Sequence, residues 1–188
     1  THALPNKNIK SESQRSEFGW RSDEIVVLHA GNMGVKQGLG NVAEAAKLAD
    51  SAQANVRFVL LGDGSEKKGL QASAEGVKGL QFIDPVGDEE FSMLLANADI
   101  LLVNELAGVS EMSVPSKLTS YFISGRPVLA ATALDGTTAG EVRAANAGVV
   151  VEAGNPQALL DAAIALGKDA LLGDQLGANG HEYAKNVL

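Results

Sequence analysis

The chain has 188 residues, of which 45% are hydrophobic, and a formal net charge of −8. This length is enough for one α/β domain with a sizeable core, and no apolar run approaches the ~20 residues of a membrane-spanning helix. The sequence has no cysteine and only His2, His29 and His181 as histidines, which argues against a thiolate or histidine metal site. The acidic balance argues against nucleic-acid or anionic-membrane partners. A small phosphorylated ligand stays possible, because screening over ~8 Å lets a few local lysines outweigh the average field.

The first 22 residues are polar and irregular, and we expect residues 1–22 to be the remnant of an interdomain linker, with Trp20 packing on the domain flank. A buried strand is predicted over 24–30, followed by the glycine loop 31–38 and a helix marked by apolar residues at helical spacing. Glycines let backbone N–H groups approach an anion, so this order is typical of a phosphate cradle. The spacing is not that of the dinucleotide fingerprint G-x-G-x-x-G, and the loop fits a tight turn with positive φ equally well.

Strands alternate with helices along the rest of the chain, and further strands are predicted at 56–61, 80–83, 100–103, 128–131 and 149–151. We expect Asp88 and Asn155 to cap two of the helices, and the tail from Gly173 to be broken by glycines until a last helical turn or two. The pattern predicts a Rossmann-like three-layer α/β/α fold with a parallel sheet of about six strands. The loops at 31–38, 84–88, 104–117 and 132–141 all leave carboxyl ends of strands, where such sheets bind ligands.

The stretch from Val114 to Leu129 predicts a short helix that Pro115 and Ser116 open and Gly125 ends. Lys117 lies in the first turn, where a cation opposes the helix dipole. This placement indicates an anion bound at the same end of the helix, although a solvated surface lysine is the simpler alternative.

Several motifs occur in an informative order: Leu28-His-Ala-Gly-Asn-Met-Gly-Val-Lys-Gln-Gly-Leu39, Val59-Leu-Leu-Gly-Asp-Gly-Ser-Glu66, Ala96-Asn-Ala-Asp-Ile100, Pro115-Ser-Lys-Leu118, Ser124-Gly-Arg-Pro-Val128 and the segment from Glu141 to Ala158. Together they resemble the C-terminal, donor-binding half of family-four retaining glycosyltransferases of the glycosyltransferase B fold, in the capsule and exopolysaccharide (colanic-acid-type) group. The resemblance covers roughly residues 22–167. It implies a nucleotide-sugar-binding domain over 23–170 and a helical tail over 171–188 that packs toward a missing N-terminal domain.

The resemblance also implies a set of site residues. The donor would be bound by Gly31, Asn32, Met33, Gly34, Pro85, Val86, Ser116, Lys117, Leu118 and Ser120, with Lys117, Lys36 and Glu111 as the catalytic groups. An arginine and a lysine of the family are replaced here by Asn32 and Gln37, so Lys36 is the nearest cation. The family's glutamate pair falls on Met112 and Ser120 and is missing; Glu111 is either its substitute or an ordinary loop carboxylate.

The implied function is sugar transfer from a nucleoside-diphosphate sugar, UDP- or GDP-linked, to a glycan or lipid-linked acceptor in polysaccharide biosynthesis. No metal or cofactor is implied, and the chain alone would be inactive without its acceptor domain. We expect the full-length protein in the cytoplasm or peripherally at the inner face of the membrane. Three alternatives stay open: a sugar-nucleotide epimerase, a nicotinamide-binding Rossmann domain with Asp63 as its ribose carboxylate, and a non-catalytic nucleotide-binding or interaction module.

Overall fold

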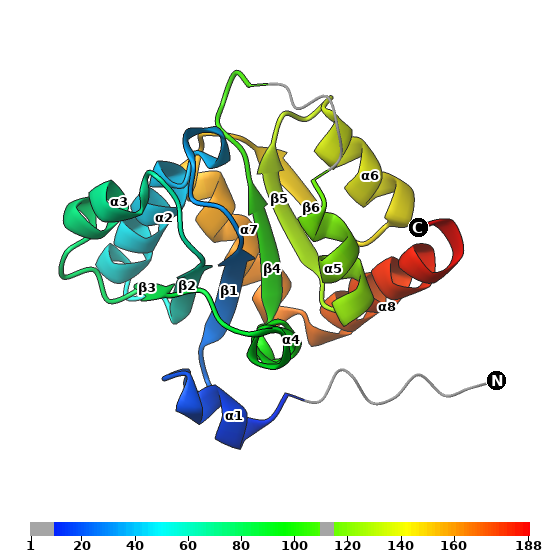
Figure 1. Ribbon diagram of the computed structural model, residues 1–188, viewed down its shortest axis with the longest axis horizontal. Coiled ribbons are helices and arrows are strands. Elements are labelled where there is room, and N and C mark those ends of the chain that lie inside the picture. The colour runs from blue at the N-terminus through cyan, green and yellow to red at the C-terminus, as the bar shows by residue number, and fades with distance from the viewer. Residues whose placement is uncertain (1–9, 110–114) are drawn as a thin grey trace.

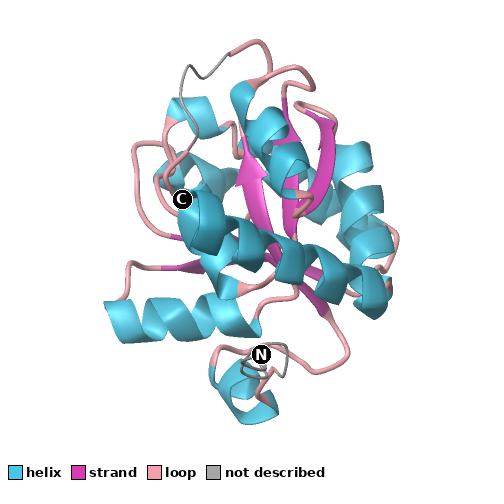
Figure 2. Ribbon diagram, turned by 90° about the vertical axis from the view of Figure 1, so that its right-hand side faces the viewer, coloured by secondary structure: helices cyan, strands magenta, loops and turns pink. Residues whose placement is uncertain are grey.

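The computed structural model describes residues 10–109 and 115–188 and shows one parallel sheet between two layers of helices (Figures 1 and 2). Its six strands have the order β3-β2-β1-β4-β5-β6. They are β1 (Ile25–Ala30), β2 (Val56–Leu61), β3 (Leu80–Ile83), β4 (Ile100–Asn104), β5 (Val128–Thr132) and β6 (Gly148–Glu152). The predicted α/β/α class with a six-stranded parallel sheet is therefore confirmed.

The described residues form eight helices, and those that follow a strand lie where the periodicity predicts. They are α1 (Glu12–Glu17), α2 (Gly40–Ser51), α3 (Lys67–Ser73), α4 (Asp88–Asn97), α5 (Lys117–Ser124), α6 (Thr137–Ala145), α7 (Pro156–Lys168) and α8 (Ala170–Val187), with a 3-10 turn η1 (Val35–Gln37). Asn155 caps α7 as predicted, since its side chain accepts from the Ala158 amide at 3.0 Å. The predicted cap of α4 is wrong: Gly87 is the N-cap residue, and Asp88 is the first residue of the helix.

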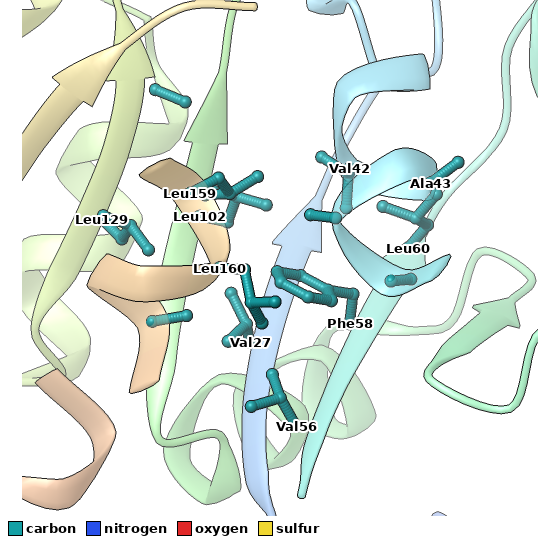
Figure 3. Close-up of a cluster of buried hydrophobic side chains, with 14 of the residues drawn as sticks. Val27, Val42, Ala43, Val56, Phe58, Leu60, Leu102, Leu129, Leu159 and Leu160 are labelled. Atoms are coloured by element: carbon teal, nitrogen blue, oxygen red, sulfur yellow. The ribbon is translucent and has the colours of Figure 1, made fainter. Parts of the chain in front are cut away.

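Successive strand residues point to opposite faces of the sheet, which gives two apolar cores. One lies under α2, α3 and α7 and contains Val27, Phe58 and Leu102 (Figure 3). The other contains Leu28 and Val103 and is covered by α4, α5, α6 and part of α8. Both faces are buried because every strand of a parallel sheet must be covered on both sides.

The sheet opens at its carboxyl edge between β1 and β4, where the strand order reverses. Only Val27 and Leu28 of β1 pair with β4, so the two strands separate beyond these residues. The Tyr121 hydroxyl fills the gap: it accepts from the Ala30 amide at 3.0 Å and donates to the Leu102 carbonyl at 2.9 Å. Tyr121 is completely buried and thereby fixes α5 over the opening, which is the place where open α/β sheets bind ligands.

Residues 10–22 are more ordered than predicted. Residues Glu12–Glu17 form α1, capped by Ser11, and the buried Arg15 guanidinium donates to the carbonyls of Asn97 at 2.7 Å and Glu24 at 3.0 Å. Trp20 is buried as predicted, and its indole N–H donates to Gln81 Oε1 at 2.8 Å. The hydrogen bonds of Arg15 attach this segment to the amino-terminal edge of the sheet.

The expectation of a glycine-broken tail is wrong, because α8 runs without interruption from Ala170 to Val187. Its glycines lie at the contact with the body of the domain. A Cβ added to Gly177 would lie 2.0 Å from the Gly125 carbonyl oxygen, closer than any side chain allows. Glycine is therefore required at this position for α8 to pack against the end of α5.

Candidate functional site

A cavity of about 480 Å³ lies at the carboxyl ends of β1 and β4, beside the start of α5. It is lined by Ala30, Gly31, Asn32, Lys36, Gln37, Val103, Asn104, Glu105, Pro115, Ser116, Lys117 and Ser120. Of the four loops expected to share one site, those at 31–38 and 104–117 line this cavity directly. The loop at 132–141 contributes through the residues that hold Glu105, and the loop at 84–88 does not reach it.

Lys117 is the central cation of this cavity. It lies next to the first glycine of the loop, since a Cβ added to Gly31 would be 3.4 Å from Lys117 Nζ. Burial lowers the pKa of Lys117 to about 8, and the negative charge of Glu105 opposes this shift. Lys117 forms no ion pair with any carboxylate in the described part of the chain. The ammonium group is therefore partly desolvated and has no described carboxylate within ion-pair distance, which suits an anionic ligand.

His29 lies on β1 beneath this cation and is completely buried. Its Nε2 is 3.2 Å from the Asn32 carbonyl oxygen, which can only accept, so Nε2 carries the proton. Burial, and after it the positive charge of Lys117, lowers the pKa of His29 to about 3. The imidazole is therefore neutral at physiological pH and holds the glycine loop in place without adding charge.

The backbone of the glycine loop is already largely hydrogen-bonded within the protein. The amides of Gly31 and Met33 donate to the carbonyls of Leu61 and Asp63, each at 2.9 Å, and the Gly34 amide donates to Gln37 Oε1 at 2.9 Å. Within 31–34, only the Asn32 amide has no acceptor in the described part of the chain. Within the glycine loop, the Asn32 N–H is thus the one backbone donor in the described structure that is left for an anion.

Asn104, the last residue of β4, fixes the far end of the same loop. Its side-chain amide is buried and donates to the carbonyls of Gln37 at 2.8 Å and Gly38 at 2.9 Å. The next contact is between backbones, where the Leu106 amide donates to the Lys36 carbonyl at 2.8 Å. The two loops that line the cavity are therefore held together by hydrogen bonds, and Lys36 is placed at the cavity wall.

Glu105 is a site residue that the sequence reasoning missed. It follows β4 directly and lines the cavity, and its carboxylate accepts hydrogen bonds from the Thr132 and Thr138 hydroxyls. The one signal for it was position: a charged residue at the carboxyl end of a buried parallel strand faces the ligand edge of the sheet. From the sequence, this residue was only one position within the loop at 104–117.

The structure brings about half of the predicted site residues to this cavity: Gly31, Asn32, Lys36, Ser116, Lys117 and Ser120. The side chains of Met33 and Leu118 are instead buried in the two cores, and Gly34 lines a neighbouring hollow. Pro85 and Val86 do not line the cavity. Glu111, like position 112, lies outside the described residues.

A second, more apolar cavity of about 570 Å³ lies between α4 and α5. It is lined by Asp88, Phe91, Ser92, Leu95, Ala96, Ser120, Ile123 and Ser124, so Ser120 borders both cavities. Over residues 10–109 and 115–188 there is no cluster of three or more histidine, aspartate or glutamate side chains that could hold a metal ion. In the same ranges, no helix has the length and apolar character needed to cross a membrane.

Comparison with known proteins decides the family. Residues 24–169 match the family model described as glycosyl transferases group 1. The chain belongs to this glycosyltransferase family. It is 30% identical over 181 residues to the putative colanic acid biosynthesis glycosyl transferase WcaI of Escherichia coli (strain K12), an alignment that covers 94% of this chain and 43% of WcaI.

Solved structures share the fold, among them those of two glycosyltransferases. WaaG, a glycosyltransferase involved in lipopolysaccharide biosynthesis, superposes with a TM-score of 0.74 at 24% identity, over 98% of this chain and 48% of WaaG. The structure of Anabaena HepE in complex with UDP superposes with a TM-score of 0.73 at 18% identity, over 97% of this chain and 49% of HepE. The C-terminal domain of LpcC from Francisella tularensis gives 0.73 at 17% identity and is covered over 98% of both chains. The chain thus spans less than half the length of WcaI, WaaG and HepE, and its likeness to the C-terminal half of the glycosyltransferase B fold is confirmed.

Proposed function

We propose that this chain is the donor-binding part of a glycosyltransferase and holds the diphosphate of a UDP- or GDP-linked sugar in the cavity between Gly31 and Lys117. The observation that carries this proposal is the partly desolvated Lys117 ammonium group beside the glycine loop. Family membership and the similarity to the UDP-bound structure of HepE support a nucleoside-diphosphate ligand.

The proposed chemistry follows from charge. When the glycosyl group departs, negative charge builds up on the oxygens of the leaving diphosphate, and fixed positive groups stabilise it. Lys117 and Lys36 both line the cavity, and at an effective dielectric of ~20 a lysine ~4 Å from a phosphate oxygen contributes up to about 4 kcal/mol before desolvation. The N-terminus of α5 adds about 0.3–1 kcal/mol, so the lysines dominate.

Transfer would need a second, acceptor-binding domain. The chain matches only 43% of the length of WcaI and 48% of WaaG, and we propose that the remaining half of the full-length protein binds the acceptor. By the same reasoning the chain alone binds its donor without transferring the sugar. The relation to WcaI supports an acceptor in polysaccharide biosynthesis.

Isothermal titration calorimetry with UDP, GDP and NAD tests the proposal. We expect UDP or GDP to bind and NAD not to bind. A thermal shift should accompany binding, since a ligand at ~100 times its dissociation constant adds about 2.7 kcal/mol to the unfolding free energy. Lys47→Ala is the matched control for Lys117→Ala, because Lys47 pairs with Glu44 on the surface of α2, away from the cavity. Binding of NAD but of neither diphosphate would contradict the proposal and favour the nicotinamide alternative.

A further inference from the structure

Glu105 places a carboxylate beside the lysines of this cavity, and its position is fixed by contacts with two elements, β5 and α6. Its backbone amide donates to the Ala131 carbonyl at 2.9 Å. One carboxylate oxygen accepts from the hydroxyl of Thr132 at the end of β5, and the other accepts from the hydroxyl of Thr138 in the first turn of α6 at 3.0 Å. Both threonines are buried, with exposed fractions of 0% and 1%. The orientation of the carboxylate is thus set by its surroundings rather than by solvent.

The described residues use only part of the hydrogen-bonding capacity of this carboxylate. An ionised carboxylate offers about four acceptor positions, two on each oxygen. Within 10–109 and 115–188, only the two threonine hydroxyls donate to the carboxylate, one to each oxygen, which leaves each oxygen a further acceptor position. Glu105 itself lines the cavity. Two parallel acceptors of this kind match a ligand that presents two neighbouring donors.

The charge of Glu105 restricts which part of a ligand can lie against it. A phosphate group is repelled by a carboxylate, whereas neutral hydroxyl groups can donate to it in charge-assisted hydrogen bonds. Lys117 attracts the phosphates at the neighbouring wall of the cavity. A ligand that carries a diphosphate and, next to it, a group rich in hydroxyls therefore satisfies both walls at once.

We propose that Glu105 is a specificity-determining residue that accepts hydrogen bonds from hydroxyl groups of the sugar carried by the bound diphosphate. The inference rests on the proposed donor binding and adds a contact to the transferred sugar. Thr132 and Thr138 are positioning residues, because they hold the two oxygens of Glu105 without contacting the ligand.

The test compares a bare diphosphate with its sugar-linked form on the same 188-residue chain. Dissociation constants of UDP, UDP-glucose, GDP and GDP-mannose are measured by calorimetry for the wild type, Glu105→Gln and Glu105→Asp. For the donor base that binds, the preference for the sugar-linked form over the bare diphosphate should fall about tenfold or more in both variants, because charge-assisted bonds to the sugar are lost or misplaced. Affinity for the bare diphosphate should change less than this preference, because Glu105→Gln removes both a charge that repels the diphosphate and a charge that favours the protonated form of Lys117.

Two controls separate this role from others. Glu44→Gln makes the same change of net charge on the exposed surface of α2 and should leave the preference unchanged. Glu105→Asp keeps the charge but shortens the side chain, so a preference that falls in Glu105→Gln and stays at the wild-type value in Glu105→Asp would show a purely electrostatic role and overturn the proposal. Equal weakening of both ligand forms would show a purely structural role and overturn it as well. If the wild-type chain binds none of UDP-glucose, GDP-mannose, UDP and GDP, the proposed donor site itself is refuted. This result is distinct from a change of preference in the variants.

Discussion

Replacing Lys117 by alanine removes the cation on which the proposed diphosphate site depends. The fold already holds this ammonium group partly out of water, and this burial lowers its pKa to about 8. Little further desolvation is then needed on binding, so a substantial part of the ~4 kcal/mol Coulomb attraction at an effective dielectric of ~20 should survive. Because Lys36 and the Asn32 amide remain, we expect Lys117→Ala to weaken UDP or GDP binding at least about tenfold, or about 1.4 kcal/mol.

The pKa of Lys117 also sets the pH dependence of binding. The diphosphate binds the protonated form, so affinity should be level near pH 7, where that form dominates, and should decline as the pH rises through 8. One unit above the pKa, only about a tenth of the lysine is protonated, which predicts about tenfold weaker binding at pH 9. Since an anion raises the pKa of Lys117, binding above pH 8 should take up a proton.

Calorimetry between pH 7 and pH 9, in buffers of different ionisation enthalpy, measures both the affinity and the proton uptake. Lys117→Arg is the matched variant, because a guanidinium stays charged over this range and should give a level profile. If the wild-type affinity is the same at pH 7 and pH 9, or if Lys117→Ala binds as tightly as the wild type, Lys117 does not hold the diphosphate.

Three further substitutions, the last with a control variant, test the scaffold of the domain. Tyr121→Phe leaves two buried backbone groups without the hydroxyl that bonds them and should lower the unfolding free energy by about 2–3 kcal/mol. Urea denaturation measures this change. A loss under about 0.5 kcal/mol would show that the hydroxyl bridge is not needed for stability. Asn104→Ala should speed amide hydrogen exchange over residues 32–38 and weaken diphosphate binding, because the loop loses its side-chain anchor; unchanged exchange would refute that role. Gly177→Ala should lower the unfolding free energy by about 1–3 kcal/mol through overpacking. Gly140→Ala, which has open space around its added Cβ, should raise the unfolding free energy by up to about 1 kcal/mol. Equal effects of the two variants would show that α8 does not need a glycine at position 177.

The architecture could be predicted because its signals are local. Short runs rich in β-branched residues, such as 25–30, are each followed by a segment with apolar residues at helical spacing. This alternation predicts a parallel sheet that is covered by helices on both faces. The same topology brings carboxyl ends to one edge, which is why Gly31 and Lys117, far apart in the chain, could be expected in one site.

Other features depend on contacts that the local sequence does not encode. Gly177 reads as a helix breaker by intrinsic propensity, yet α8 forms because the close approach to Gly125 outweighs that cost. A glutamate after a strand has no motif, so the fixed orientation of the Glu105 carboxylate becomes apparent only from the hydroxyls of Thr132 and Thr138 on its two oxygens. Likewise, the glycine pattern could not reveal that the Gly31 amide is already bound to the Leu61 carbonyl.

A crystal structure of the chain with bound UDP or GDP tests the central claim most directly. The account predicts that diphosphate oxygens lie within hydrogen-bonding distance of Lys117 Nζ and the Asn32 amide, at the carboxyl ends of β1 and β4. A diphosphate bound elsewhere, for example in the cavity between α4 and α5 with Lys117 left facing solvent, would contradict it.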